Sequence, residues 1–147
     1  MDSIDIKILN HLKKNSRENA SVIAEKVDLS VSAVIERIRK LEAADIIKQY
    51  TIVLNEKGIG KDVCAYISIS IDHPKYNEDF ENFVRENKNI TECAYLAGDF
   101  DYLLKVVTDD TEGLERLLFA IKSIAGISKT KTMLVLSGVK TDYSVEL

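Results

Sequence analysis

Two carboxylates follow a glycine at the start of an apolar run. Residues 97–106 read AGDFDYLLKV, so Asp99 and Asp101 come just before the residues of an expected strand. Four kinds of structure would use acids there: a hairpin turn, an acid–base catalytic pair, a metal site or a ligand-binding loop. The other side chains and the elements that position them discriminate among these four.

A turn accounts for only part of this pattern. Gly98 and Asp99 suit the positive φ angles that tight turns use. Asp101 comes two residues later, at the start of a strand, where a turn requires no acid. A carboxylate there can hold an α-ammonium group, while N–H groups of the turn can donate to an α-carboxylate. We therefore predict that Asp101 binds a ligand with these two poles, such as an amino acid.

The catalytic and metal alternatives have less support. A carboxylate pair can do acid–base work, but no His, Cys or Lys motif beside it supplies a nucleophile, and no glycine-rich phosphate loop occurs. His11 and His73 fall in different expected domains. We expect no enzyme, no metal and no cofactor. An oxygen-only Mg²⁺ or Ca²⁺ site at the turn is the remaining metal alternative.

Composition sets the broad class. The 147 residues, 46% hydrophobic and 30% charged, suffice for one ordinary domain or two small ones. No apolar run reaches the roughly 20 residues that span a bilayer, and the start MDSIDIKIL lacks the features of a signal peptide. We expect a cytoplasmic protein that does not contact a membrane. Cys64 and Cys93 form no CxxC pattern and are expected to be free thiols on strands.

Charge is distributed unevenly along the chain. The net charge is −4, but residues 1–60 carry +1 and residues 61–147 carry −5. A nearly neutral part with clustered basic side chains can still bind phosphates, because the local field matters more than the total. The asymmetry indicates two parts with different functions.

The N-terminal part predicts three helices. Apolar residues at helical spacing mark helices over 4–12, 20–27 and 31–41, with Asn19 and Ser30 as caps of the second and third. A tight corner at 27–29 joins the last two, as in a helix-turn-helix. Residues 46–54, IIKQYTIVL, predict a strand, followed by a glycine-containing linker. We predict a winged helix-turn-helix domain over 1–48 and a strand-bearing linker over 49–61.

The third helix has a face suited to DNA. Steps of 100° turn the apolar residues inward and place small and charged residues outward, with Arg37 on the flank. Small residues allow close approach, and arginine and lysine can address guanine edges and phosphates. A solvated surface helix is the alternative. The outward residues are Ser32, Ala33, Glu36, Arg39, Lys40 and Ala43.

The C-terminal part, 62–147, changes to the period of a sheet. Residues 63–71 alternate cleanly, helices are predicted over 75–86 and from Leu114 to near Gly126, and strands over 90–97, 102–108 and 130–137. The order βαββαβ is that of a ferredoxin-like α+β domain. With both helices on one face, the other face of the sheet needs a partner, and a second copy would supply it.

Two motifs together resemble a known family. LSVSAVIERIRKLEAADIIKQYTIVLN (29–55), followed by ECAYLAGDFDYLLKV (92–106), is similar to the Lrp/AsnC, or feast/famine, transcription regulators. The resemblance implies a winged helix-turn-helix joined to a ferredoxin-like domain that binds an effector and oligomerises. It also implies a homodimer, often assembled into an octamer, that binds double-stranded DNA and an amino acid. The family often has glycine where this chain has Asp28, which tolerates the same left-handed conformation.

The resemblance also assigns site residues. It places Ser30, Ser32, Arg37, Arg39 and Lys40 at the DNA, where Ala33 also faces. It matches the effector site to the set Tyr95, Gly98, Asp99, Asp101, Thr130, Thr132, Met133 and Leu134. We therefore predict a sequence-specific transcriptional regulator modulated by a small effector, with an effector-independent architectural DNA-binding protein as the alternative.

Overall fold

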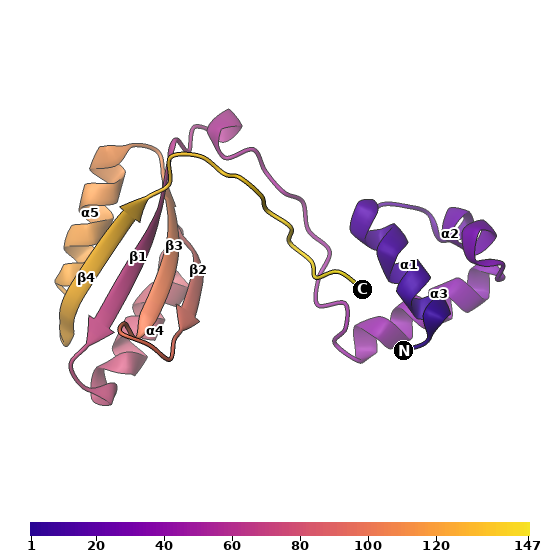
Figure 1. Cartoon of the computed structure of the whole chain (residues 1–147), viewed down its shortest axis with the longest axis horizontal. Helices are drawn as coiled ribbons and strands as arrows, with labels where there is room; N and C mark the ends of the chain where they lie inside the picture. Colours follow the sequence, from indigo (N-terminus) through magenta and orange to yellow (C-terminus); the bar gives the residue numbers. More distant parts are fainter. The chain divides into compact units, whose positions relative to one another are not determined.

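The computed structural model describes all 147 residues, which divide into two compact units (Figure 1). One unit contains Met1–Val53 and Lys140–Leu147, and the other contains Leu54–Val139. These units are drawn at other bounds than the predicted domains, 1–48 and 62–147 with a linker over 49–61, which stay a prediction.

The first unit is built from three helices, α1 (Ser3–Lys14), α2 (Ala20–Val27) and α3 (Val31–Ala43). Asp2 caps α1 through a capping box with Asp5, so the first helix begins at a well-defined point. Apolar side chains from all three helices meet in one small core, which includes Ile8, Ile23 and Val34. Burial of this shared stripe stabilises helices that are too short to persist alone.

The corner between α2 and α3 has the expected geometry. Asp28 adopts the left-handed conformation at φ 55° and ψ 48°, which confirms that aspartate suffices there. Ser30 caps α3, and its hydroxyl accepts the backbone N–H of Ala33 at 3.2 Å. Asn19 precedes α2 as predicted, but its side chain makes no capping hydrogen bond.

The strand predicted over 46–54 is absent from the structure. Residues 47–55 have no regular secondary structure and carry exposed apolar side chains, among them Tyr50, Ile52 and Val53. A strand exists only when a neighbouring strand satisfies its N–H and C=O groups, and none lies beside this segment within the chain. The prediction of a strand was therefore wrong for the single chain, although the apolar pattern behind it is real.

The second unit confirms the βαββαβ order. Its strands are β1 (Val63–Ile71), β2 (Ile90–Tyr95), β3 (Tyr102–Thr108) and β4 (Ile127–Leu134), and its helices are α4 (Asn77–Glu86) and α5 (Thr111–Lys122). Short 3₁₀ turns occur at Lys57–Ile59 (η1) and Pro74–Tyr76 (η2). The sheet is antiparallel with the order β2-β3-β1-β4.

Both helices pack on one face of this sheet (Figure 1). The core beneath them contains alternate strand residues, such as Ile67 and Leu104, and helix residues such as Phe80 and Ile121, all fully buried. Strand alternation turns the intervening residues to the opposite face. That uncovered face presents large side chains that are partly exposed, including Tyr66 and Met133.

Two local predictions differ from the structure. β4 lies at Ile127–Leu134 rather than 130–137, because it starts directly after the turn at Gly126, where φ is +87°. Gly98 and Asp99 do not adopt positive φ angles, so the expected tight-turn geometry there was wrong. The loop from β2 to β3 is longer than a two-residue hairpin and therefore needs no left-handed residue.

Candidate DNA and effector sites

The outward face of α3 has the predicted accessibility. Ser32, Arg39 and Lys40 are exposed, and Ala33 is half-buried. The Ser30 hydroxyl lies 3.1 Å from that of Ser32, which places two hydroxyl groups together at the start of the helix. Arg39 makes no ion pair within the chain, and Lys40 makes only a 3.7 Å contact with Glu36. These side chains are free to reach a groove or a phosphate.

Arg37 differs from the rest of the predicted DNA-contacting set. Its guanidinium Nη1 donates to Asp5 Oδ1 at 2.7 Å and to Asp2 Oδ2 at 2.8 Å, across to the first turn of α1. Hydrogen bonds to these two carboxylates raise the pKa of Arg37 above its usual value. Its contact with DNA stays a prediction, but the side chain is already occupied within the unit.

The second carboxylate of the β2–β3 loop has a structural partner. Asp101 Oδ2 accepts the backbone N–H of Ile71 at 2.7 Å, and the Asp101 N–H donates to the carbonyl of Ile69 at 2.9 Å. The loop is thereby tied to the end of β1. Oδ1 of Asp101 makes no hydrogen bond within the chain, and the side chain is only half-buried, so one carboxylate oxygen remains available to a ligand.

A basic group that the sequence did not single out lies at the same loop. The ammonium of Lys129, at the start of β4, stands 5.3 Å from the centre of the Phe100 ring. Lys129 pairs with Ser70, next to the Ile71 that Asp101 binds. Cation–π contact of this kind orients a lysine without neutralising it. The loop therefore combines an acid and a base, which only the strand register brings together.

The predicted effector residues divide into two groups. Gly98, Asp99 and Asp101 share the loop, and Thr130 lies nearby because it pairs with Ile69. The remaining residues of β4 lie farther along the strand, by about 3.3 Å per residue, and alternation turns Met133 to the face opposite Thr130. The residues farther from the loop within one chain are Thr132, Met133 and Leu134, which pair with Ile67, Tyr66 and Ala65.

Tyr95 lies at the end of β2 with its ring 5.0 Å from that of Tyr102, at a tilt of 54°. It is 69% exposed. Tyr102 is buried and donates its hydroxyl to Glu81 at 2.8 Å; burial, aided by that bond, raises its pKa well above the usual value. One side of the Tyr95 ring therefore packs on the buried Tyr102, and the rest of the ring is exposed at the edge of the sheet.

The structure does not support a metal site, a reactive thiol or a membrane-spanning helix. No group of three or more His, Cys, Asp or Glu side chains is arranged to hold a metal ion. Cys64 and Cys93 are free, and burial raises the pKa of both thiols, which makes them poor nucleophiles. None of the helices has the length and apolar character to cross a membrane.

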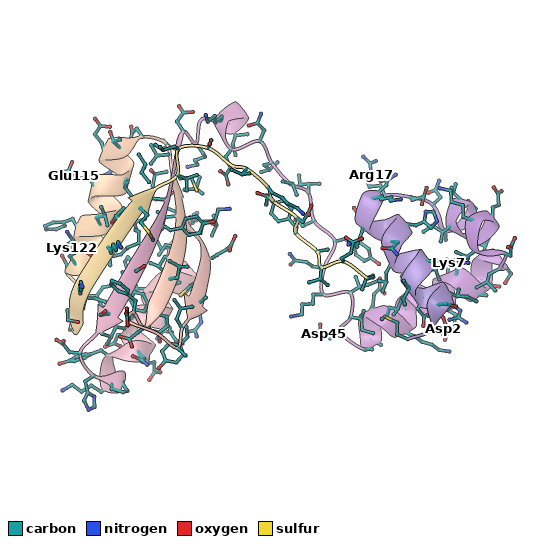
Figure 2. All side chains as sticks on the ribbon, in the orientation of Figure 1. Asp2, Lys7, Arg17, Asp45, Glu115 and Lys122 are labelled. Atoms are coloured by element: carbon teal, nitrogen blue, oxygen red, sulfur yellow. The ribbon has the colours of Figure 1, made fainter.

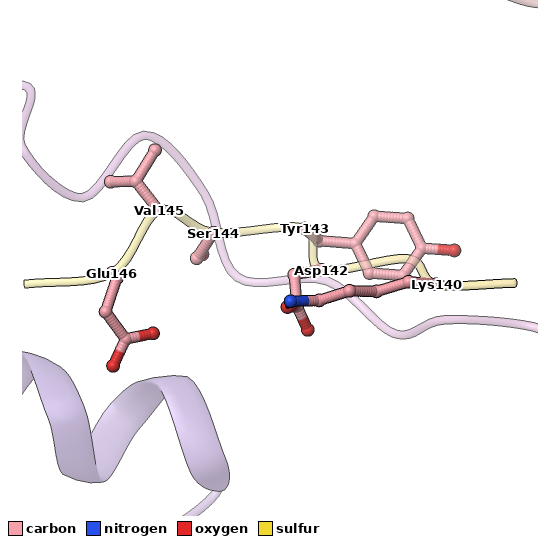
Figure 3. Close-up of a pocket in the computed structure, with 6 residues that line it drawn as sticks. All are labelled: Lys140, Asp142, Tyr143, Ser144, Val145 and Glu146. Atoms are coloured by element: carbon pink, nitrogen blue, oxygen red, sulfur yellow. The ribbon is translucent and has the colours of Figure 1, made fainter.

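A shallow hollow lies on the C-terminal tail, lined by residues of the tail itself (Figure 3). The tail contacts α1 through Lys13, whose ammonium donates to the carbonyl of Val145 at 2.6 Å and lies 3.9 Å from the carboxylate of Glu146. Tyr143 and Val145 are 69% and 79% exposed, so little apolar surface holds the segment in place.

Two family models match the chain. Residues 1–48 match a winged helix-turn-helix DNA-binding domain, and residues 64–145 match the Lrp/AsnC ligand-binding domain. The first range coincides with the predicted DNA-binding domain, and the second falls inside the predicted effector domain.

Relatives match over most of their length. An uncharacterised helix-turn-helix-type transcriptional regulator of Pyrococcus horikoshii is 34% identical over 99% of this chain and 98% of its own. The leucine-responsive regulatory protein of Escherichia coli is 33% identical over 95% of this chain and 87% of its own.

Solved structures agree with the fold of the chain. A transcriptional regulator from Neisseria meningitidis, in complex with L-methionine, superposes with a TM-score of 0.94 at 31% identity, over 99% of this chain and 96% of the other. AsnC of Escherichia coli superposes with a TM-score of 0.89 at 26% identity, over 96% and 95%.

Proposed function

Because this chain belongs to the Lrp/AsnC family of DNA-binding transcriptional regulators, we propose that an amino acid bound at the β2–β3 loop modulates its DNA binding or assembly. The observation that carries the proposal is the placement of opposite charges at this loop. Asp101 keeps one carboxylate oxygen unbonded, and Lys129 lies over Phe100 of the same loop. An amino acid carries an ammonium group and a carboxylate on one carbon atom, so it offers a charge of the opposite sign to each member of such a pair.

The structural neighbour with L-methionine bound supports an amino acid as the effector class. Gly98 supports a site at the loop as well, because a Cβ added there would meet nothing within 4 Å, and its φ is not positive. Neither packing nor backbone geometry within one chain therefore explains a glycine. Close approach by a ligand or by another subunit would explain it.

The DNA interface is proposed on the outward face of α3. Ser32, Arg39 and Lys40 have the exposure that base or phosphate contact requires, and Ser30 and Ala33 lie at the helix start beside them. One such unit makes few phosphate contacts, and affinity grows with the number of phosphates neutralised. Two units would be needed for tight, sequence-specific binding.

The second unit would come from a homodimer formed on the uncovered face of the sheet. Tyr66 and Met133 lie on neighbouring strands of this face, paired in register, and are 37% and 42% exposed. The extended apolar segment 47–55 also has unpaired backbone groups that a second chain could satisfy. An octamer of four such dimers is the larger assembly that we propose.

Thermal unfolding of the protein against each of the twenty amino acids tests the effector proposal. Binding at 100 times Kd adds about 2.7 kcal/mol of stability. Asp101→Asn is the informative variant, because the amide oxygen can still accept the Ile71 N–H while the charge is lost. Glu115→Gln, an exposed residue of α5 without an ion pair, is the matched control (Figure 2). A selective stabilisation that disappears only in Asp101→Asn supports the proposal, and no stabilisation by any amino acid contradicts it.

One observation favours the alternative of an architectural DNA-binding protein without an effector. The hydrogen bond from Ile71 to Asp101 gives this acid a structural role that requires no ligand. Under this alternative, neither the wild type nor Asp101→Asn would respond to any amino acid, while DNA binding would remain intact in both.

A further inference from the structure

We propose that Arg37 is a positioning residue, which clamps the recognition helix α3 to the start of α1, and that contact with DNA is left to Arg39 and Lys40. The inference deepens the DNA interface proposed above and rests on it. It assigns a function to three residues, Asp2, Asp5 and Arg37, that act together and not as separate surface charges.

The clamp has specific geometry. One guanidinium nitrogen of Arg37 donates to both acids, at 2.7 Å to Asp5 and 2.8 Å to Asp2. The side chains of Asp5 and Arg37 are 14% and 29% exposed, so this contact is much better shielded than an ordinary surface ion pair. Hydrogen bonds between charged partners at these distances are shorter and stronger than neutral ones.

The two acids are themselves held in place. Asp2 Oδ1 accepts the N–H groups of Ile4 and Asp5, each at 2.9 Å, and Asp5 Oδ2 accepts the N–H of Asp2. Asp2 lies at the very start of α1 (Figure 2). The oxygens that remain, Asp2 Oδ2 and Asp5 Oδ1, are the ones that bind Arg37. The capping box thus holds both carboxylates in the positions where they accept hydrogen bonds from the guanidinium of Arg37.

Arg37 lies on the flank of the proposed DNA-reading face, about 60° around α3 from Lys40, and its guanidinium is bound to α1. Two residues correspond to about 200° around an α-helix, so Arg37 and Arg39 lie on nearly opposite sides of α3. The burial pattern agrees, because Arg39 is exposed while Arg37 is half-buried beside α1. Of the two arginines, Arg37 is paired with Asp2 and Asp5, and Arg39 is the one without a partner in the chain.

A directional contact is needed because the rest of this junction is apolar. The shared core includes Ile8 of α1 and Val34 of α3, and apolar burial is non-directional. Such packing alone tolerates small rotations of α3 about its axis. A rotation that displaces a side chain by an ångström or so would misalign hydrogen bonds to base edges, while attraction to phosphates would be little affected.

The test compares two DNA probes: a duplex that the wild-type protein selects from a randomised library, and a random-sequence duplex. Four variants of the full chain are measured: Asp5→Asn, Arg37→Met, the double variant, and Glu25→Gln. Glu25 is an exposed residue of α2 without an ion pair, so its change controls for the loss of one negative charge.

A positioning role predicts that Asp5→Asn and Arg37→Met each weaken binding to the selected duplex by about tenfold, because an amide has one acceptor oxygen where Asp5 uses both of its oxygens. The double variant should be no worse than Arg37→Met, because both changes act on one interaction. Binding to the random duplex and the slope of affinity against salt should stay as in the wild type. A direct DNA contact predicts the reverse for Asp5→Asn, because this change removes a negative charge and releases Arg37. Unchanged or tighter binding by Asp5→Asn, or a salt slope that falls by about one in Arg37→Met, overturns the proposal.

Circular dichroism of each variant confirms that the helices are intact before affinities are compared. If Arg37→Met does not fold, Arg37→Lys replaces it, because an ammonium can reach one acid at a time, and an intermediate loss of selectivity is then expected. Wild-type affinity for the selected duplex in both Arg37→Lys and Asp5→Asn would contradict the clamp. If the wild type selects no duplex at all, the proposed DNA interface is wrong, and the inference that rests on it is wrong too.

Discussion

The Asp101 carboxylate accepts the backbone N–H of Ile71 at 2.7 Å, which joins the β2–β3 loop to the end of β1. This bond gives the acid a structural role beside the ligand-binding role proposed for its other oxygen. The two roles have different requirements: the first needs an acceptor atom, and the second needs a negative charge. Substitutions at this position can therefore separate them.

Asp101→Ala should destabilise the C-terminal unit by about 1–2 kcal/mol, because the half-buried N–H of Ile71 loses its acceptor. Asp101→Asn keeps an acceptor and should cost less than about half of that. Urea unfolding of the two variants checks the difference. Equal losses of stability would mean that the charge, not the acceptor, holds the loop.

Two glycines provide a matched comparison. Gly126→Ala should destabilise the protein by about 2 kcal/mol or more, because φ at Gly126 is +87° and an added Cβ would clash with the ring of Tyr76. Gly98→Ala meets nothing within 4 Å and has no positive φ, so stability should be unchanged.

The second variant also tests the effector site. If a ligand or a second subunit approaches the loop closely, Gly98→Ala should reduce amino-acid binding by tenfold or so while leaving the melting temperature of the free protein unaltered. Isothermal titration calorimetry measures the binding. Full binding by Gly98→Ala would show that nothing packs against this position.

Charge on the outward face of α3 should govern the salt dependence of DNA binding. Arg39→Ala and Lys40→Ala each remove a side chain that makes no strong contact within the chain. Each should lower the slope of log affinity against log salt by up to about one, without changing thermal stability. Fluorescence anisotropy across a salt series measures the slope. Slopes equal to that of the wild type in both variants would exclude this face as the DNA interface.

Acid should destabilise the N-terminal unit. Hydrogen bonds from the Asp5 N–H and from Arg37 hold the pKa of Asp2 below its usual 3.8, and a hydrogen bond from Lys26 holds the pKa of Glu18 below its usual 4.5. A carboxyl group whose pKa is lowered by folding adds stability that is fully present above its unfolded pKa and is lost as the pH falls through the folded one.

The melting temperature of this unit should therefore be constant at neutral pH and decline as the pH falls below these two usual values. Circular dichroism melts between pH 7 and pH 2 measure the decline. In Arg37→Met, the decline in melting temperature that Asp2 causes should be smaller than in the wild type. A melting temperature that rises on acidification would contradict the assignment of both carboxylates as hydrogen-bonded anions.

The uncovered face of the sheet should mediate dimerisation. Tyr66→Glu places a charge in the middle of this face and should yield monomers, because burying an unpaired carboxylate is strongly unfavourable. Phe119→Glu is the control, since Phe119 is 75% exposed on α5, the helix layer on the opposite side. Sedimentation equilibrium distinguishes the outcomes. A Tyr66→Glu protein that remains dimeric would place the interface elsewhere.

Local signals predicted most of the fold. The 20–27 helix and the strands Val63–Ile71 and Tyr102–Thr108 have the predicted bounds, because helical spacing, clean alternation and an apolar run mark them in turn. The segment 46–54 was predicted wrongly, since its strand pattern requires a partner that one chain does not contain. An apolar pattern indicates which residues are suited to burial, but it does not indicate whether the same chain or a second one buries them.

The candidate site was predicted less completely than the fold. Asp101 was identified by type and spacing, but its bond to Ile71 depends on where the loop crosses the sheet. Lys129 joins the loop only through the β1–β4 register, which no local pattern specifies. Likewise, helix geometry predicted that Arg37 lies on a flank of α3. Its hydrogen bonds to Asp2 and Asp5 depend on how α1 packs against α3, which no local pattern specifies.

We propose that an amino acid and DNA bind this protein interdependently. The most direct test measures affinity for the selected duplex with and without the amino acid that stabilises the protein in thermal unfolding. A typical coupling of about 1–3 kcal/mol predicts a change in DNA affinity of roughly 5- to 150-fold, and DNA must change the affinity for the amino acid by the same factor. Equal DNA affinities at zero and saturating amino acid, whether or not it binds, would contradict the account.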